Sequence, residues 1–495
     1  MEKNVEIFCE ILERYTVDLL VGVVAALCCI GWLKREKNLP PGPIGLPVVG
    51  YLPFLGNEAY LTLHNLTHKY GPIFSFYLGR KLVVVLGNFD VVREALTNSK
   101  ILDRPKNPPN HLLPDSTNLS VVNGNIWKEQ RRFSIQTLRD FGMGKSKLED
   151  IIQTELHKLI AEIDSRNGHS MNLDEVLLPS VSNIVLTLMA GMALDFKHED
   201  RLFLNKMLKT MVVFFRPTRL HAYFPSLRYW MAKFKIWGYD QAEYYMDKFS
   251  KFIMKQIEDH KRTLDSYLVK DYIDSYLLVL KSNEHTESSF SEKMLKGNFQ
   301  SLFSAGSTPS RAAVEWSFMA MILHPDIQKA VHAELDAVLG KDHPPTWRDH
   351  VNLPYTMSVV YEVMRHSTVV PIGMLRCTSS RTKIGAYDIP EDTIVMPNLW
   401  GVHHDAGYWE NPFAFRPERF LKDGRAVRPR AFVPFSCGKR KCPGEDMAIM
   451  IVFLYFASLM QKYSICLPEK DADVKQILGV AKLIILDNVC LKKRH

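Results

Sequence analysis

The chain is 495 residues long, with 46% hydrophobic and 23% charged residues, which is ordinary for a globular protein with a large core. Its net charge of +8 is too small for this length to indicate nucleic-acid binding, but it suits a protein that faces anionic lipid or an acidic partner. The eight cysteines are scattered and predict neither a disulfide framework nor a structural zinc site, which favours a reducing compartment.

An apolar run from Tyr15 to Leu33 predicts a membrane anchor, because it approaches the roughly 20 residues that a helix needs to cross a bilayer. A cleaved signal peptide is the alternative, but the run ends in the charged residues 34–37 and not at a small-residue cleavage site. The residues before the run are mostly acidic, so the positive-inside rule leaves the rest of the chain cytoplasmic. We therefore expect residues 1–33 to form a retained anchor.

Residues 34–50 are basic and then rich in proline, which predicts a semi-rigid spacer between the anchor and the body. No repeat or low-complexity stretch divides the chain after residue 50. We therefore expect one large domain over residues 51–495.

The first part of this domain predicts a β-hairpin and then mostly helices up to about residue 340. Residues 73–87 are rich in Phe, Tyr and Val, with a turn signal at Gly79-Arg80. Further on, Trp127 and Arg131 stand four residues apart and share one helix face, as they would on an ordinary solvated helix.

A long central helix is predicted between Ser289 and His324, with Ser289 and Glu292 as a capping box and a length of about 50 Å. Its middle reads Ala305-Gly306-Ser307-Thr308-Pro309-Ser310. Pro309 has no backbone N–H and cannot bond to the carbonyl of Ala305, so we expect a bend and a carbonyl in need of another partner.

Leu353-Pro354 opens another predicted helix, in which Glu362 and Arg365 are three residues apart and share a face. Short strands are predicted between Thr382 and Met396. A second arginine-containing motif, which includes Arg419, spans Phe415 to Phe420.

The last distinctive stretch places one cysteine between two glycines, just before an apolar helix predicted to start near Pro443. Glycines let a loop lie against a flat ligand, and the basic neighbours and the helix N-terminus favour a thiolate. For Cys437 we expect only a buried free thiol. A thiolate at Cys442 is suited to be an axial ligand of haem iron. The stretch reads Phe435-Ser-Cys-Gly438-Lys-Arg440-Lys-Cys442-Pro-Gly444.

These ten residues resemble the haem-binding signature of the cytochrome P450 family, Phe-x-x-Gly-x-Arg-x-Cys-x-Gly, at all its fixed positions. Residues 133–144 are similar to the second family of vertebrate microsomal cytochromes P450, which hydroxylate drugs and steroids, and residues 38–50 resemble the proline-rich hinge of the microsomal enzymes. The resemblance extends from the anchor to about residue 465.

The resemblance implies a mainly α fold with a small β-rich portion, and haem b held between the central helix and the Cys442 loop. It implies that Trp127, Arg131, Arg376 and Arg440 contact the haem propionates, and that Glu362, Arg365 and Arg419 are structural supports. Phe435, Gly438 and Gly444 shape the loop itself. The residues that would line an apolar substrate pocket are Val121, Phe214, Ala305, Val370 and Met374, although core packing is an equal alternative for Phe214.

The implied reaction is the insertion of one oxygen atom from O₂ into a small lipophilic substrate such as a steroid, a fatty acid or a foreign compound. The implied electron donor is NADPH–cytochrome P450 reductase, with cytochrome b5 as a second donor, and Lys128 and Arg132 are candidates for the donor-facing surface. The implied location is the endoplasmic reticulum membrane, with a single N-terminal span and a cytosolic catalytic domain.

One departure from the family pattern leaves other functions open. The family carries an acid and a threonine for proton delivery where this chain has Thr308 and Pro309, so we expect Thr308, Pro309 and Ser310 to determine how protons arrive. A haem-thiolate isomerase or dehydratase acting on a pre-oxygenated lipid would not need that pair. A non-catalytic haem or lipid-binding protein is a further alternative, and a membrane protein without haem is the remotest.

Overall fold

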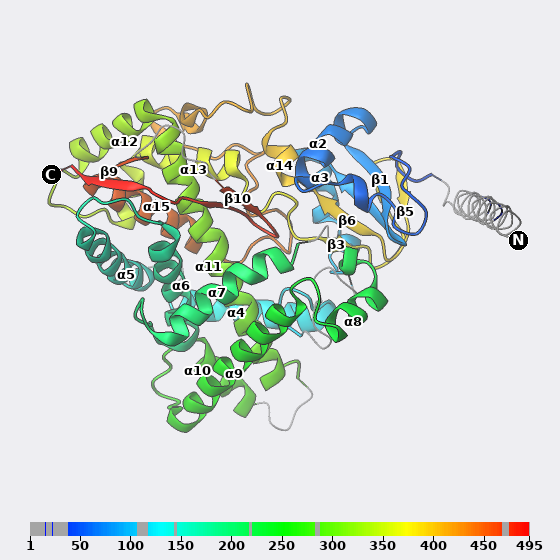
Figure 1. The fold of residues 1–495 in the computed structure, drawn as a ribbon, viewed down its shortest axis with the longest axis horizontal. Coiled ribbons are helices and arrows are strands. Elements are labelled where there is room, and N and C mark those ends of the chain that lie inside the picture. The colour runs from blue at the N-terminus through cyan, green and yellow to red at the C-terminus, as the bar shows by residue number, and fades with distance from the viewer. Residues whose placement is uncertain are drawn as a thin grey trace, which may run out of the picture.

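The computed structural model describes residues 38–105, 117–142, 146–216, 220–282, 288–467 and 475–494, together with Tyr15 and Gly22. Helices make up most of the described chain, and the strands gather mainly beside α2 and α3 (Figure 1). This agrees with the mainly α class with a small β portion. The predicted anchor lies outside the described residues except for Tyr15 and Gly22, and within the described ranges no helix is long and apolar enough to cross a bilayer.

The helix α11, Glu292–Leu323, runs through the middle of the molecule (Figure 1). It is buried along much of its length, with Phe299, Phe303 and Phe318 fully enclosed, because its neighbours pack around it on several sides. The helices that pack against it include α6 (Asp174–Ala190), α9 (Tyr239–Thr263), α12 (Pro325–Val338), α13 (Pro354–Ser367) and α15 (Glu445–Lys462).

One detail of α11 differs from the sequence prediction. The N-cap is Ser291, whose hydroxyl accepts a hydrogen bond from the backbone N–H of Met294, and not Ser289. Ser289 is used elsewhere, because its carbonyl and hydroxyl oxygens accept hydrogen bonds from Gln130. As predicted, the helix continues through Pro309, where tertiary packing on several sides offsets the lost backbone bond.

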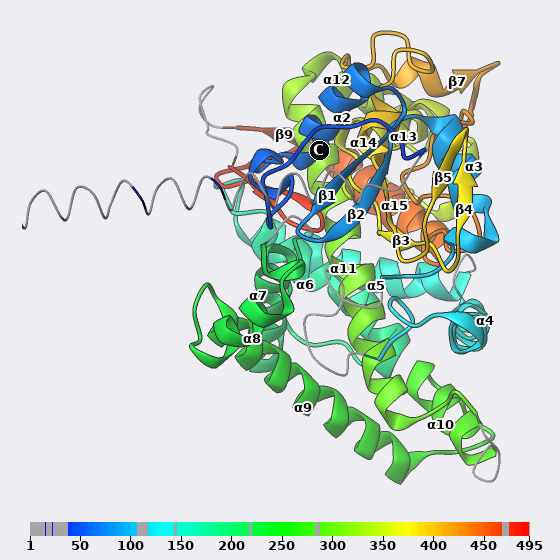
Figure 2. The same ribbon diagram turned by 90° about the vertical axis from the view of Figure 1, so that its right-hand side faces the viewer.

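Figure 2 shows where several of the other helices lie. The turned view shows α9 and α10 at the end of the molecule opposite β7, and α7 and α8 beside α9. The remaining α-helices are α2 (Ala59–Tyr70), α3 (Phe89–Thr97), α4 (Gly124–Asp140), α5 (Ser146–Ser165), α7 (Glu199–Phe214), α8 (Pro225–Lys233), α10 (Tyr272–Ser282) and α14 (Leu399–His403). The 3₁₀ turns are η1 (Leu52–Phe54), η2 (Ser99–Ile101), η3 (Leu220–Ala222), η4 (Trp347–Val351) and η5 (Pro417–Phe420).

The predicted hairpin is present as β1 (Ile73–Leu78) and β2 (Lys81–Leu86), which pair antiparallel around the Gly79-Arg80 turn. They belong to a sheet with strand order β1-β2-β6-β3, in which β6 (Ile394–Pro397) runs parallel to β2. The strand β3 (Arg376–Cys377) carries Arg376 to the edge of this sheet. The other strands are β4 (Thr382–Ile384), β5 (Tyr387–Ile389), β7 (Leu421–Lys422), β8 (Arg425–Ala426), β9 (Tyr463–Cys466), β10 (Lys475–Leu478), β11 (Lys482–Ile485) and β12 (Cys490–Lys493).

The described part of the predicted spacer, residues 38–50, belongs to the body. The backbone N–H of Ser75 in β1 donates to the carbonyl of Pro41 at 2.8 Å, and the N–H of Gly79 donates to the carbonyl of Val49 at 3.0 Å. Gly42 approaches so closely that a Cβ there would lie 1.7 Å from the carbonyl oxygen of Ser75. The boundary predicted at residue 50 is therefore too late, because backbone pairing attaches the proline-rich segment to the sheet.

Candidate active site

The loop that carries Cys442 is folded against α3. The backbone N–H of Cys442 donates to the carbonyl of Phe435 at 3.0 Å, which closes the loop. Gly438 has a φ of +76°, and a Cβ there would lie 2.1 Å from the carbonyl oxygen of Leu96. Only glycine combines that conformation with that contact. The helix α15 begins at Glu445 with Gly444 as its N-cap, two residues later than predicted from Pro443.

The residue Cys442 is partly exposed, but the burial of its thiol opposes ionisation. Burial raises its pKa, whereas the backbone N–H of Gly444 and the positive charges of Arg131 and Lys441 act in the opposite direction. The basic neighbours favour the thiolate, as expected, but desolvation outweighs them and the net shift of the pKa is upward. A metal cation at the sulfur would reverse this balance, since coordinated thiols lose their proton.

Four arginines from distant parts of the chain converge near this loop, and no carboxylate among the described residues pairs with them. Burial and mutual repulsion both lower the pKa of Arg440, to about 9, and burial lowers that of Arg376 to about 10. Burial also lowers the pKa of Arg104, followed by the charges of the other three. The four residues are Arg104, Arg131, Arg376 and Arg440.

Arg440 lies at the centre of this cluster. Its guanidinium carbon is 4.3 Å from the centroid of the buried Trp127 ring, and Nη2 donates to the carbonyl of Val122 at 2.7 Å and to Asn123 Oδ1 at 2.9 Å. Its Nε and Nη1 atoms are buried without a hydrogen-bond partner among the described residues. Unpaired N–H groups on a buried cation need hydrogen-bond acceptors, and an anionic acceptor would also neutralise the charge.

The other arginines tie the loop to its surroundings. Arg131 Nη2 donates to the carbonyl of Lys441 at 2.7 Å, and Arg376 Nη2 donates to the carbonyl of Arg440 at 3.0 Å. Arg104 was not predicted from the sequence. It donates to the carbonyls of Ser120, at 3.0 Å, and Leu375, at 2.6 Å. No local pattern marks Arg104, whose role depends on segments that are distant in sequence.

This cluster fits the two carboxylates of a haem. Planar guanidinium groups suit carboxylate acceptors, and the excess of buried positive charge is what a dianionic group would neutralise. Cys442 lies on the same loop as Arg440. The residues present therefore fit the cofactor that the sequence implies.

We expect Arg440→Gln to weaken haem retention, because glutamine keeps the hydrogen bond to Val122 but removes the charge. Hydrogen bonds to charged groups contribute about 1.5–3 kcal/mol, so haem transfer to apomyoglobin should become roughly 10- to 150-fold faster. The exposed neighbouring residue provides the control variant, Lys439→Gln, which should transfer haem at the native rate. Equal rates for Arg440→Gln and the native protein would contradict the assignment.

The central part of α11 faces this loop. A Cβ on Gly306 would lie 3.5 Å from Met447 Cε, and one on Gly444 would lie 3.6 Å from the same atom. Ala305 is exposed although α11 runs through the core. The hydroxyl of Ser307 bonds back to the carbonyl of Phe303 at 2.7 Å.

Thr308 and Ser310 differ from Ser307. Both are buried, at 6% and 4% exposure, and neither hydroxyl makes a hydrogen bond with any residue that the structure describes. The carbonyl of Ala305 also lacks its usual donor at Pro309, so each of these polar atoms is available to water or a ligand.

The predicted pocket residues divide into two groups. Val121 follows Ser120, whose hydroxyl contacts that of Ser301 on α11. Arg104, which bonds to the carbonyl of Ser120, also donates to the carbonyl of Met374 at 3.0 Å. Val121 and Met374 therefore both belong to segments that Arg104 joins, and Val370 is partly exposed on the nearby loop after α13. Phe214 is different, because its ring packs against those of Tyr239, at 4.9 Å, and His221, at 5.6 Å. It belongs to the core, which was the alternative interpretation.

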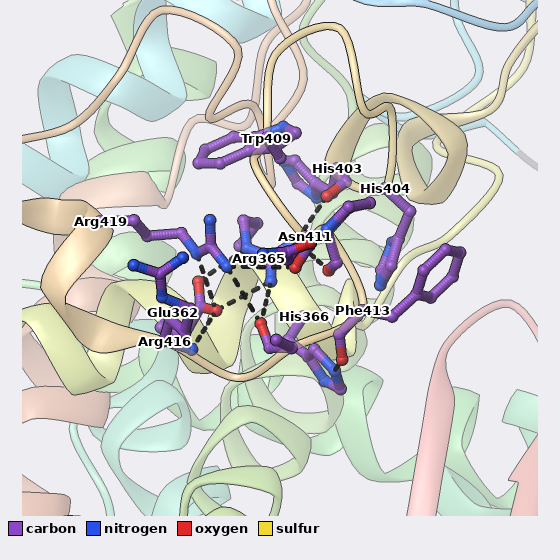
Figure 3. Close-up of polar contacts among 12 residues, drawn as sticks. Glu362, Arg365, His366, His403, His404, Trp409, Asn411, Phe413, Arg416 and Arg419 are labelled. Carbon is purple, nitrogen blue, oxygen red and sulfur yellow. Dashed lines mark hydrogen bonds and ion pairs between the residues drawn. The ribbon is translucent and has the colours of Figure 1, made fainter.

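The predicted contact among Glu362, Arg365 and Arg419 is present (Figure 3). Arg365 donates from Nε and Nη2 to the two carboxylate oxygens of Glu362, at 2.7 and 2.8 Å, and Arg419 Nε donates to Oε1 at 3.1 Å. The side chains of Glu362 and Arg365 are fully buried. These residues contact each other and not the Cys442 loop.

His403 connects this group to the Cys442 loop, and sequence reasoning missed it. Its carbonyl accepts from Arg365 Nη1 at 2.6 Å (Figure 3), and its Nε2 accepts from the backbone N–H of Val433 at 3.0 Å. Burial lowers its pKa to about 3, followed by the charge of Arg365, so the ring is neutral. Its Nδ1–H therefore donates to the hydroxyl of Thr368 at 2.9 Å.

Another group of buried charged residues, on α11 and α6, was not predicted from the sequence. Arg311 Nη2 contacts Asp174 Oδ1 at 2.5 Å and Glu315 Oε1 at 2.8 Å. Burial raises the pKa of Glu315 to about 8, although Arg311 opposes the shift. The available signal was an arginine and a glutamate four residues apart within an apolar stretch.

Comparison with known proteins gives consistent results. A family model described as Cytochrome P450 matches residues 40–489. The chain is similar to Cytochrome P450 2U1 of Bos taurus, with 35% identity over 93% of this chain and 90% of the relative. It is 34% identical to Cytochrome P450 2J1 of Oryctolagus cuniculus, over 92% and 91%. It is 32% identical to Cytochrome P450 18a1 of Drosophila melanogaster, over 97% and 92%.

Proposed function

Because this chain belongs to the cytochrome P450 family of haem-thiolate monooxygenases, we propose that it inserts one atom of O₂ into a steroid, a fatty acid or a foreign lipophilic compound. Haem b is the cofactor, with Cys442 as its axial thiolate. The observation that carries the proposal is on the Cys442 loop itself, where the buried Nε and Nη1 atoms of Arg440 have no hydrogen-bond partner among the described residues. Electrons would come from NADPH through the flavoprotein reductase.

The residues of this chain would bind and orient the two reactants. When bound, the haem supplies the redox chemistry of oxygen activation. Arg440, Arg131 and Arg376 would hold its carboxylates. The apolar side chains of Val121, Val370 and Met374 would bind an apolar substrate and exclude water, with Ala305 allowing close approach.

Proton supply is the step at which this chain would differ from the family pattern. The hydroxyls of Thr308 and Ser310 make no hydrogen bond with a described residue, and the carbonyl of Ala305 offers an acceptor. A water held by the Thr308 hydroxyl and the Ala305 carbonyl, three residues apart on one side of α11, would stand in for the missing acid and threonine, since a bridging water needs two to four polar partners.

Restoring the family pair tests this step. We expect Thr308→Glu with Pro309→Thr to raise the amount of product per NADPH severalfold, because positioned proton donors contribute about 10²–10⁴-fold to rates. Pro309→Ala serves as the control, since it restores the backbone N–H without adding a hydroxyl. If the amount of product per NADPH is the same in the double variant as in the native protein, the native atoms already supply the proton.

The same departure favours a second candidate, an isomerase or dehydratase that acts on a pre-oxygenated lipid and needs no proton relay to O₂. Labelled oxygen distinguishes the two. NADPH- and reductase-dependent product that carries an atom from ¹⁸O₂, across a panel of steroids, fatty acids and drugs, would support the monooxygenase. Turnover of a lipid peroxide without NADPH or reductase would support the second candidate.

The surface suits a location at the endoplasmic reticulum membrane with the catalytic domain in the cytosol. The segment from α8 to the start of α9 exposes Tyr229, Trp230, Phe234 and Trp237, and exposed aromatic side chains of this kind favour a membrane interface. The exposed side chains of Lys128, Arg132, Lys439 and Lys441 lie on α4 and on the Cys442 loop. They would face the acidic surface of the reductase or of cytochrome b5.

A further inference from the structure

Two free cysteines face each other across a two-stranded ribbon near the C-terminal end of the chain. The strands β9 and β12 pair antiparallel, and Cys490 is the direct partner of Cys466. Figure 1 shows β9 beside the C-terminus, at the edge of the molecule. Neither residue belongs to the site described above.

The backbone hydrogen bonds define the type of pairing at this position. Arg494 N donates to the carbonyl of Lys462 at 3.0 Å across the ribbon. The backbone N–H of Ile465 donates to Gln328 Oε1 at 2.8 Å, and its carbonyl accepts from Gln328 Nε2 at 3.1 Å. Both backbone groups of Ile465 therefore point away from β12. Because the two pair types alternate along an antiparallel ladder, Cys466 and Cys490 form a hydrogen-bonded pair, with Cα atoms about 5.5 Å apart.

That separation is near the commonest Cα distance in disulfides, about 5.5–6 Å. Both cysteines are partly exposed on the outer face of the ribbon, whereas Ile465 and Leu491 fill its core side at 3% and 2% exposure. Directly opposite Cβ atoms lie about 4.5–5.5 Å apart, a little farther than the usual disulfide value of about 3.8 Å. The ribbon must therefore contract slightly, and a bond formed under such strain is readily reduced.

We propose that Cys466 and Cys490 are a redox modification site, which hydrogen peroxide oxidises reversibly to an intrachain disulfide. One thiolate attacks a peroxide oxygen, so that an S–O bond forms, the O–O bond breaks and water leaves after protonation. The second thiol then displaces the oxygen from that sulfur as a second water. In total, two thiols lose two electrons and two protons, and one peroxide becomes two waters.

The disulfide would fix the base of the segment that carries the hairpin β10–β11. This hairpin is anchored at its tip, where Val480 N donates to the carbonyl of Val212 at 3.2 Å and Lys482 N donates to the carbonyl of Val369 at 2.7 Å. Val369 precedes the proposed pocket residue Val370. Oxidation would therefore restrain a segment that borders the pocket.

Peptide mapping of the full-length haem-containing protein tests the proposal. The protein is reduced, treated with hydrogen peroxide, alkylated and digested with trypsin. We expect residues 463–470 and 483–492 to appear as one linked peptide, lighter than their sum by two hydrogens, with loss of both alkylated peptides. Dithiothreitol should restore them, and the melting temperature should be higher in the oxidised form.

A register-shifted variant provides the matched control. Cys490→Ser with Lys492→Cys keeps two thiols on the same face but moves one to a diagonal position, about 7–8 Å from Cys466, which a disulfide does not span. No linked peptide should form in this variant. The proposal is overturned if the native protein gives only separately oxidised or alkylated cysteines, if the link joins two molecules, or if the shifted variant cross-links equally.

Discussion

Glu362→Ala should reduce the free energy of unfolding by about 3–5 kcal/mol, the usual cost of breaking a buried ion pair, out of a typical total of about 5–15 kcal/mol. The variant leaves the guanidinium of Arg365 fully buried without its carboxylate, and removes the acceptor of Arg419 and of the Arg416 backbone N–H. Denaturant unfolding monitored by circular dichroism measures the loss, and we expect little folded, haem-containing protein at 37 °C.

The matched control is Glu410→Ala, which removes an exposed ion pair with Arg416 at 3.3 Å. Exposed pairs of this kind contribute about 0–1 kcal/mol, so this variant should unfold almost as the native protein does. Similar stabilities for the two variants would refute a supporting role for Glu362. A second readout is the yield of haem, which should fall with Glu362→Ala, because His403 joins Arg365 to Val433 at the start of the Cys442 loop.

Cys442→Ser should abolish the thiolate-shifted Soret band of the reduced, CO-bound protein and eliminate monooxygenase activity. A serine hydroxyl does not ionise near neutral pH and cannot donate electron density to iron as a thiolate does. The fold should survive, because the backbone bond from position 442 to the carbonyl of Phe435 does not involve the side chain. Absorption spectroscopy of the reduced protein with CO checks the prediction.

The control is Cys437→Ser, five positions earlier on the same loop and also partly exposed. Its spectrum and activity should match those of the native protein. A thiolate-type band that persists in Cys442→Ser but disappears in Cys437→Ser would transfer the ligand assignment to the earlier cysteine. Loss of the band in both variants, with normal unfolding curves, would indicate that the loop geometry and not the sulfur alone holds the haem.

The sequence alone determined the family, the cofactor and the ligand, because Phe435, Gly438, Arg440, Cys442 and Gly444 lie within ten consecutive residues. Local patterns also determined the β1–β2 hairpin and the contact between Glu362 and Arg365. In each case the interacting groups are near in sequence, so spacing and residue type carry the information.

The tertiary structure decided whatever depends on segments that are far apart. The pairing of residues 38–50 with β1 overrides the boundary predicted at residue 50. The packing of Phe214 against the rings of His221 and Tyr239 overrides its predicted role in the pocket.

The roles of Arg104, His403 and the pair Cys466–Cys490 also needed the fold. Their partners are distant along the chain, and no periodicity in a single sequence encodes such contacts. Desolvation is likewise a property of the folded environment, which is why basic neighbours in the sequence predicted a thiolate at Cys442 whereas burial raises its pKa. The sequence predicted the cofactor and its cysteine ligand, whereas the fold determines the charges and contacts around them.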